Sequence, residues 1–272
     1  ALPILMSVEK LKEKLEWAEK EGKLPKIVVP VHFSGQSCDM KEIHDLGQQY
    51  DFKIVEDAAH AIGSSYDGNI TGSCKYSDIT VFSFHPVKII TTGEGGCALT
   101  NDKNLAKKMN LYRSHGITRD SEEMVKNITE DWYYEQICLG YNYRMTDIQA
   151  ALGISQLKRL KQFVNKRMDI ASWYNQHFKN IPVNLLVSGK YGQSSHHLYI
   201  IRAQNTAIRD KLFNYLKSKN INVNLHYIPI YRHPYHKGTP ICFNAEEYFE
   251  SAISLPIFYT LSEENLKRIV RV

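Results

Sequence analysis

Lys88 is the residue of this chain with the clearest capacity for covalent chemistry. Apolar runs come before and after it, so the lysine lies on a loop between two predicted strands. Ser83 supplies a hydroxyl five residues earlier, and three glycines follow that let the backbone approach a ligand closely (Gly93, Gly95, Gly96). A lysine amine in such a place can form a Schiff base beside a phosphate. A solvated loop lysine would show the same local pattern, so this stretch alone leaves both interpretations open.

Asp57 supplies a second functional group, at the predicted carboxyl end of the strand that begins at Lys53. Open parallel sheets bind their ligands in the crevice at that end of the strands. An isolated aspartate there more often caps the turn that follows. Together with Lys88 and Ser83, however, Asp57 completes the groups that pyridoxal phosphate needs: an amine for its aldehyde, a carboxylate for its ring nitrogen and a hydroxyl for its phosphate. These residues therefore predict a pyridoxal phosphate site.

Helices and strands alternate in the part of the chain that would position these groups. Helices are predicted after the capping residues Ser7 and Asp39, over 102–114, and from Thr146 to about Phe178 with a bend or break. Strands are predicted over 27–33 and 53–55 and on both sides of Lys88, with a hairpin or loop over 64–76. Such alternation is typical of a mostly parallel central sheet flanked by helices.

A smaller unit is predicted after Pro182. Strands are expected over 196–203 and 221–226, and helices over 206–219, 245–251 and 262–270. We therefore expect an α/β protein in which residues 1–160 form part of a large cofactor-binding domain. Residues 161–272 would form a small C-terminal α+β domain.

The composition excludes several classes of protein. The chain has 272 residues, of which 43% are hydrophobic and 23% are charged, as is usual for a globular protein. No apolar run is long enough to span a membrane, and the net charge of +5 forms no basic stripe, so neither membrane insertion nor nucleic-acid binding is expected. The five cysteines form no C-x-x-C pair, which argues against a metal site and favours the reducing cytoplasm.

Four motifs, in order along the chain, identify a family resemblance. They are Glu56-Asp57-Ala-Ala-His60-Ala, Ser83-Phe-His-Pro-Val-Lys88, Glu94-Gly-Gly96 and Gly140-Tyr-Asn-Tyr-Arg144-Met. This set resembles the DegT-type sugar aminotransferases, which are fold-type I pyridoxal phosphate enzymes. The resemblance covers nearly the whole chain.

The resemblance implies a role for each matching residue. Lys88 matches the lysine that forms the Schiff base, Asp57 the partner of the ring nitrogen, and His60 the residue beside it near the ring oxygen. Ser83 matches a phosphate ligand. Asn142 matches an asparagine that reaches the cofactor phosphate of the other subunit, so a homodimer with shared active sites is implied.

Three further residues are candidates for binding the sugar nucleotide or the carboxylate of the amino donor: Arg144, His226 and Tyr227. An arginine at a helix start and a histidine at a strand end are as often structural, so that alternative stays open for the first two. His85 lies close to Lys88 in the sequence, but no role is assigned to it.

Segments 111–118, 132–134 and 225–231 most resemble the branch of the family that works in pseudaminic acid biosynthesis. This implies transfer of an amino group, with glutamate as donor, to C4 of a UDP-linked 4-keto-6-deoxy sugar. Related dehydratases carry histidine in place of the lysine, and Lys88 argues against that class. Two alternatives remain: a non-catalytic relative that dimerises or binds the cofactor without turnover, and an aminotransferase for ordinary amino acids.

The ends of the chain depart from the family pattern. Family members begin with a segment that carries a phosphate-binding turn and an aromatic residue that stacks on the cofactor, and no equivalent precedes Ser7. The last helix also stops earlier than in the family. We therefore expect an N-terminally truncated chain that binds the cofactor more weakly and exposes an apolar edge or face of the sheet.

Overall fold

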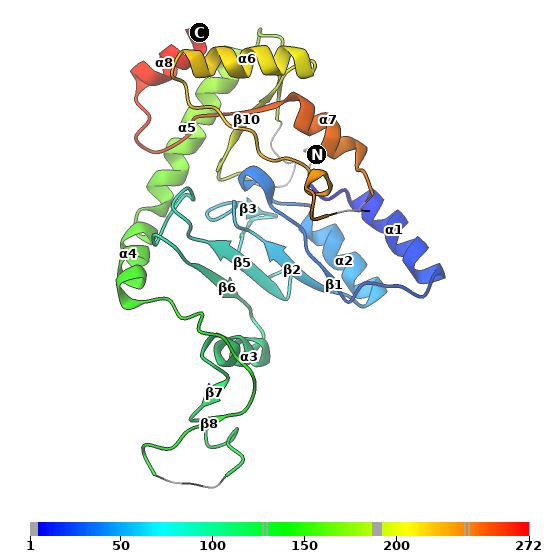
Figure 1. The fold of residues 1–272 in the computed structure, drawn as a ribbon, viewed down its shortest axis with the longest axis vertical. Coiled ribbons are helices and arrows are strands. Elements are labelled where there is room, and N and C mark those ends of the chain that lie inside the picture. Colours follow the sequence, from blue (N-terminus) through cyan, green and yellow to red (C-terminus); the bar gives the residue numbers. More distant parts are fainter. Residues whose placement is uncertain are drawn as a thin grey trace.

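The computed structural model describes residues 5–126, 128, 130–186, 192–236, 238 and 240–271. Within these residues a four-stranded sheet has the order β1-β2-β5-β6, and a three-stranded sheet has the order β11-β10-β9. Figure 1 shows helix α5 (Leu160–Phe178) running from the region of the first sheet towards the second. The predicted division of the chain at residue 160 stays a prediction.

The four-stranded sheet positions the candidate site. Strands β1 (Ile27–Val28), β2 (Lys53–Asp57) and β5 (Ile79–Ser83) are parallel, and β6 (Gly96–Leu99) pairs with β5 in the antiparallel sense. Because parallel strands point the same way, the last residues of β2 and β5 lie at the same edge of the sheet. The strands predicted on both sides of Lys88 are therefore confirmed.

Helices α1 (Val8–Lys20) and α2 (Met40–Tyr50) pack against one face of this sheet. The Ser7 hydroxyl caps α1 by accepting a hydrogen bond from the backbone N–H of Lys10 at 3.2 Å. Apolar side chains at helical spacing form the core between the helices and the sheet: Leu15, Met40, Ile43, Leu46, Tyr50, Phe52 and Ile54. Asp39 precedes α2 as predicted, but its side chain makes no capping hydrogen bond, so that part of the prediction is wrong.

The opposite face of the sheet presents apolar side chains to solvent. Successive strand residues point to opposite faces, and the odd-numbered positions Ile27, Val29 and Val31 are 55%, 47% and 44% exposed. Val31, Asp57 and Val81 lie in register across three neighbouring segments, so the Asp57 side chain shares this open face. Within the described residues these apolar side chains are thus partly exposed, and the expected link to a truncated chain stays a prediction.

A separate part of the chain extends away from the sheet in Figure 1. It contains α3 (Lys103–Arg113), capped by the Asp102 carboxylate, and the two short paired strands β7 (Ile117–Thr118) and β8 (Glu135–Gln136). Residues 115–145 were predicted to form a long loop. Among the described residues of this segment, the regular structure consists of β7 and β8, which have two residues each. Several of its aromatic residues are exposed: Trp132, Tyr134, Tyr141 and Tyr143.

Helix α4 (Asp147–Leu157) follows this part, and a break at 158–159 separates it from α5, as predicted. Thr146 and Gln149 form a complete capping box at its start. No residue of α4 is buried, although the helix carries four large apolar residues (Ile148, Leu152, Ile154, Leu157). The helix therefore presents apolar side chains that nothing in the described chain covers.

The three-stranded sheet is antiparallel and lies with helices from the last third of the chain. Its strands are β9 (Asn184–Leu185), β10 (Tyr199–Arg202) and β11 (Ala252–Leu255). Its helices are α6 (Thr206–Ser218), α7 (Phe243–Ser251) and α8 (Glu263–Arg271). Tyr174 of α5 is fully buried in the core that this sheet and α8 share. The α+β character of this region is as predicted.

Several predicted elements differ in the structure. The strand expected over 27–33 ends at Val28, because Pro30 has no N–H to donate to a ladder, and a 3-10 turn η1 (Phe33–Gly35) follows. The strand expected over 221–226 is absent from the described residues; only Asn224 forms an isolated bridge, with Ser254.

Two short elements lie in loops, and one strand of the second sheet was not expected. The segment 64–76 contains a hairpin of β3 (Ser65–Tyr66) and β4 (Asn69–Ile70), as predicted. A second 3-10 turn, η2 (Ile230–Arg232), follows the candidate substrate residues. Strand β11 was not predicted, because its four residues lie between a helix and Pro256.

Candidate active site

The loop between β5 and β6 holds Lys88 in a defined position. The backbone N–H of Lys88 donates to the carbonyl oxygen of His85 at 2.9 Å, which closes a turn after Pro86. The next two residues, Ile89 and Ile90, are buried against Phe163 and Val164 of α5. The lysine is therefore fixed by apolar packing immediately after it, while its own side chain is half-buried.

The glycines after Lys88 have a structural reason. Gly95 has φ +154°, and a Cβ atom there would lie 2.4 Å from the Thr92 hydroxyl oxygen and 2.8 Å from a Met145 side-chain carbon. Thr92 also donates its backbone N–H to the carbonyl oxygen of Phe84 at 3.0 Å. A side chain at position 95 would therefore clash with the Thr92 and Met145 side chains that pack against this loop.

Asp57 lies at the end of β2, near enough to Lys88 for its charge to act on the lysine amine. One carboxylate oxygen of Asp57 accepts a hydrogen bond from the backbone N–H of Ala59 at 3.0 Å, and the other has no partner among the described residues. Burial lowers the pKa of Lys88 below its ordinary value, and the charge of Asp57 opposes that shift. The site therefore combines a partly desolvated amine with a carboxylate that keeps one oxygen available.

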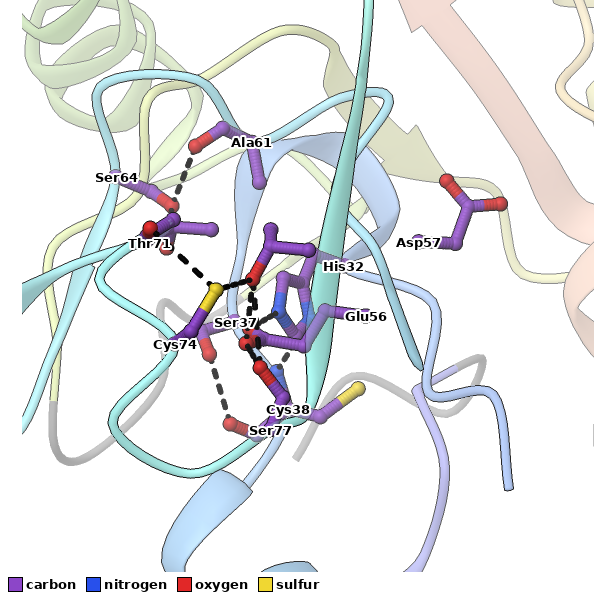
Figure 2. A network of polar contacts seen from close by, with 12 residues as sticks. His32, Ser37, Cys38, Glu56, Asp57, Ala61, Ser64, Thr71, Cys74 and Ser77 are labelled. Atoms are coloured by element: carbon purple, nitrogen blue, oxygen red, sulfur yellow. Dashed lines mark hydrogen bonds and ion pairs between the residues drawn. The ribbon is translucent and has the colours of Figure 1, made fainter. Parts of the chain in front are cut away.

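A buried polar network lies behind Asp57, on the covered face of the sheet (Figure 2). Glu56 accepts hydrogen bonds from the hydroxyls of Ser77 and Thr80, and its other oxygen lies 2.6 Å from Nε2 of His32. The backbone N–H of Cys38 donates to Nδ1 of His32 at 3.3 Å, which leaves Nε2 as the donor to Glu56.

This network connects directly to the strand that carries Asp57. The backbone N–H of His32 donates to the carbonyl oxygen of Asp57 at 2.9 Å. Burial alone would raise the pKa of Glu56, but the hydrogen bonds from His32, Ser77 and Thr80 lower it below its ordinary value. Glu56 is thus a carboxylate with both oxygens bonded, while the neighbouring Asp57 points the opposite way, towards the open face (Figure 2).

His60 lies beside the same crevice and is neutral. The backbone N–H of Ser34 donates to Nδ1 of His60 at 3.3 Å, so Nε2 carries the proton and donates to the hydroxyl of Tyr227, also at 3.3 Å. Burial lowers the pKa of His60 to about 3, and the charges of Lys88 and His226 act in the same direction. His60 and Tyr227, which were predicted from different parts of the chain, are therefore in contact.

We expect the neutral His60 to make the protein sensitive to acid. Unfolded histidine binds a proton near pH 6.5 and folded His60 only near pH 3, so stability falls as the pH drops through this window. At pH 5 the loss due to His60 is about 2 kcal/mol. Urea unfolding at pH 7 and pH 5 should show that His60→Gln removes this part of the loss, whereas His233→Gln, at an exposed histidine, does not. Equal losses in the wild type and His60→Gln would contradict this assignment.

His226 and His197 complete the surroundings of the lysine. Nδ1 of His226 lies 2.8 Å from the Ser254 hydroxyl, and burial and then the charge of Lys88 lower its pKa. The ring of His197 lies 4.3 Å from that of His60, and its Nδ1 is buried without a described partner. His197 was not predicted as a site residue, because no local spacing in the sequence connects it with His60.

Of the other predicted residues, Ser83 lies at the same sheet edge as Asp57, whereas Asn142 and Arg144 lie apart from this cluster. Ser83 ends β5 at the sheet edge, and its hydroxyl accepts a hydrogen bond from the backbone N–H of His85 at 3.4 Å. Asn142 is exposed and forms an isolated bridge with Ser114 at the end of α3. Arg144 is also exposed and makes no side-chain contact within the described residues. The structure therefore does not bring Asn142 or Arg144 to the Lys88 of the same chain.

In the described part of the chain, no group of three or more histidine, cysteine or acidic residues could hold a metal ion. None of the described helices is long and apolar enough to cross a membrane.

A model of the DegT/DnrJ/EryC1/StrS aminotransferase family matches residues 4–272. The chain belongs to this family. The resemblance predicted from the four motifs is thus confirmed.

Relatives and solved structures agree with this placement in the family. The UDP-4-amino-4,6-dideoxy-N-acetyl-beta-L-altrosamine transaminase of Campylobacter jejuni is 39% identical over 243 residues, which cover 87% of this chain and 61% of that protein. The structure of Helicobacter pylori PseC, an aminotransferase involved in the biosynthesis of pseudoaminic acid, matches with a TM-score of 0.88 at 29% identity. It covers all of this chain, which spans 70% of the PseC chain.

A third likeness bears on the cofactor. The PLP form of Spr1654 from Streptococcus pneumoniae matches with a TM-score of 0.82 at 28% identity, over 98% of this chain and 70% of that one. The predicted α/β fold class is confirmed by these structures, and aminotransferases of the DegT family use pyridoxal phosphate.

The residues of the crevice fit this cofactor. Lys88 offers an amine with a lowered pKa, and Asp57 offers a carboxylate oxygen that has no partner among the described residues. Ser83 lies at the same sheet edge with a hydroxyl that could hold a phosphate.

Proposed function

We propose that the chain is a pyridoxal phosphate-dependent aminotransferase that transfers an amino group, with glutamate as donor, to C4 of a UDP-linked 4-keto-6-deoxy sugar. The observation that carries the proposal is the half-buried Lys88 amine on the loop at the sheet edge where Asp57 ends β2, with the Asp57 charge acting on that amine. Membership of an aminotransferase family and the likeness to the Campylobacter transaminase support it.

Each residue of the crevice has a distinct task in this proposal. When bound, pyridoxal phosphate supplies an aldehyde that the Lys88 amine captures and a ring that withdraws electrons from the substrate. Asp57 pairs with the ring nitrogen, and His60 lies beside it. Lys88 also moves the proton at its Nζ atom during transfer, and burial, which lowers its pKa, favours this role. Ser83 holds the phosphate.

Asp57→Asn is expected to lower turnover by about 10- to 100-fold, because it removes a charge-assisted hydrogen bond to the ring nitrogen. The side chain keeps its shape, so folding should be retained. Steady-state rates with glutamate and a UDP-linked keto sugar would measure the loss. Asp45→Asn, at an exposed position of α2, is the matched control and should keep wild-type turnover. Equal rates for the two variants would contradict the role of Asp57.

The substrate class can be tested with a panel of acceptors. The proposal predicts turnover with a UDP-linked 4-keto-6-deoxy sugar and glutamate, with His226 and Tyr227 near the bound substrate. Turnover with simple 2-oxo acids but with no sugar nucleotide would show an aminotransferase for ordinary amino acids instead. A chain that binds the cofactor and turns over neither class would be a non-catalytic relative.

We also propose that the active form is a homodimer in which Asn142 reaches the cofactor phosphate of the partner. Asn142 lies on the part of the chain that extends away from the sheet (Figure 1), where it does not contact Lys88. The uncovered apolar side chains of α4 lie close by in the sequence and would be buried in such a contact. Sedimentation velocity would test the dimer. A cytoplasmic location stays a prediction.

A further inference from the structure

A pocket of about 350 Å³ opens beside the candidate active site. It lies between the Lys88 loop, the junction of α4 and α5, and the segment 258–260. Three basic residues line it (Lys88, Arg159, Arg167), and none of the described residues that line it is acidic. A pocket with this charge balance is suited to an anion.

Arg167 gives the pocket a buried positive charge. Its residue is only 6% exposed, and one guanidinium nitrogen, Nη1, donates to the carbonyl oxygens of His196, His197 and Ile257 at 3.1, 3.1 and 2.8 Å. Burial lowers the pKa of Arg167 to about 10, so the group is still charged at neutral pH. Its other two nitrogens have no partner in the described part of the chain. A buried cation without a carboxylate is costly unless an anion joins it.

Arg159 supplies a second cation at the mouth of the pocket. Its guanidinium carbon lies 4.7 Å from the ring centre of Phe163 and 5.4 Å from that of Tyr259. This stacking holds the planar group while its N–H donors, which lie in the plane, stay available. No carboxylate pairs with Arg159 among the described residues. A planar fork held in this way is suited to a bidentate contact with a carboxylate or phosphate.

We propose that this pocket binds an anionic oxygen group of a substrate beside Lys88, with Arg159 as the contacting residue and Arg167 as the buried charge behind it. The inference rests on the proposed function. Two substrates of that reaction carry such a group: the amino donor has carboxylates, and the sugar nucleotide has a diphosphate. Both groups present negatively charged oxygens, so the same arginine side chains could bind either one.

Calorimetric titration of the chain without cofactor can test the pocket. The probes are 2-oxoglutarate, for the donor carboxylates, and inorganic pyrophosphate, for the diphosphate. Arg159→Gln removes the charge and should raise the Kd of at least one probe about tenfold or more. Lys158→Gln is the matched control: it removes the same charge from the neighbouring exposed residue, which does not line the pocket, and should change the Kd less than about twofold.

The probe whose binding weakens identifies the source of the anion, and weakening of both shows that the pocket accepts either group. The inference is overturned if neither probe binds the wild type, or if Arg159→Gln and Lys158→Gln weaken binding equally. Borohydride trapping of pyridoxal phosphate on Lys88, in the same variants, separates this result from the proposed function. If the cofactor is trapped on Lys88 but Arg159→Gln does not change the Kd, only the proposal for the pocket is overturned. If Arg159→Gln weakens binding selectively but no cofactor is trapped, only the proposed aminotransferase function is overturned.

Discussion

Lys88→Ala is expected to lower aminotransferase turnover by about 10³-fold or more, because it removes both the group that captures the cofactor and the group that moves the proton. The loop should stay folded in the variant, since Ile89 and Ile90 provide its packing. Rates of amino transfer from glutamate to the UDP-linked keto sugar measure the effect.

Lys103→Ala is the control for this experiment. Lys103 is an exposed lysine at the start of α3 that makes no described side-chain contact, so its loss should leave turnover unchanged. Circular dichroism should show the same helix content in both variants. Substantial residual turnover in Lys88→Ala would contradict the role given to this lysine.

Glu56→Gln is expected to lower the free energy of unfolding by about 3 kcal/mol. The carboxylate accepts three hydrogen bonds in the buried network, and an amide would turn one of its oxygens into a donor that faces Nε2 of His32. Urea unfolding monitored by fluorescence measures the change.

Glu13→Gln provides the matched control for Glu56→Gln. Glu13 also pairs with one basic side chain, Lys10, but at the surface, where the two side chains are 55% and 68% exposed. Solvent screens such a pair, so the same substitution should change the free energy of unfolding far less than Glu56→Gln does. If both variants lost equal stability, the network of Glu56 would not contribute as the structure indicates.

The strand–loop–strand arrangement around Lys88 could be predicted because its signals are local. Apolar runs, a proline and closely spaced glycines all lie within a short stretch, and each has a direct backbone consequence. Asp57 could be predicted in the same way, because it ends an apolar strand. The register of β2 and β5 then brings the strand end near the loop.

Contacts between distant parts of the chain could not be predicted. His197 lies against His60, and Arg167 donates to Ile257, yet nothing in their local sequence indicates either contact. The partner of Glu56 was missed for the same reason, because His32 lies on another segment of the sheet. Such contacts follow from the packing of whole elements, which spacing within one element does not encode.

For helix α4, the sequence predicts the helix but not what covers its apolar side chains. Its apolar residues recur at helical spacing and its start at Thr146 is as predicted, but none of its residues is buried in the described chain. Periodicity indicates that a face should be covered, without showing whether the same chain or another covers it.

The attachment of pyridoxal phosphate to Lys88 is the central claim of this account. It can be measured by mixing the purified chain with the cofactor, reducing with borohydride and locating the added mass by peptide mass spectrometry. We expect one modified peptide, which contains Lys88, together with visible absorbance that the reduction removes. Absence of modification, or modification spread over exposed lysines with Lys88 unmodified, would contradict it.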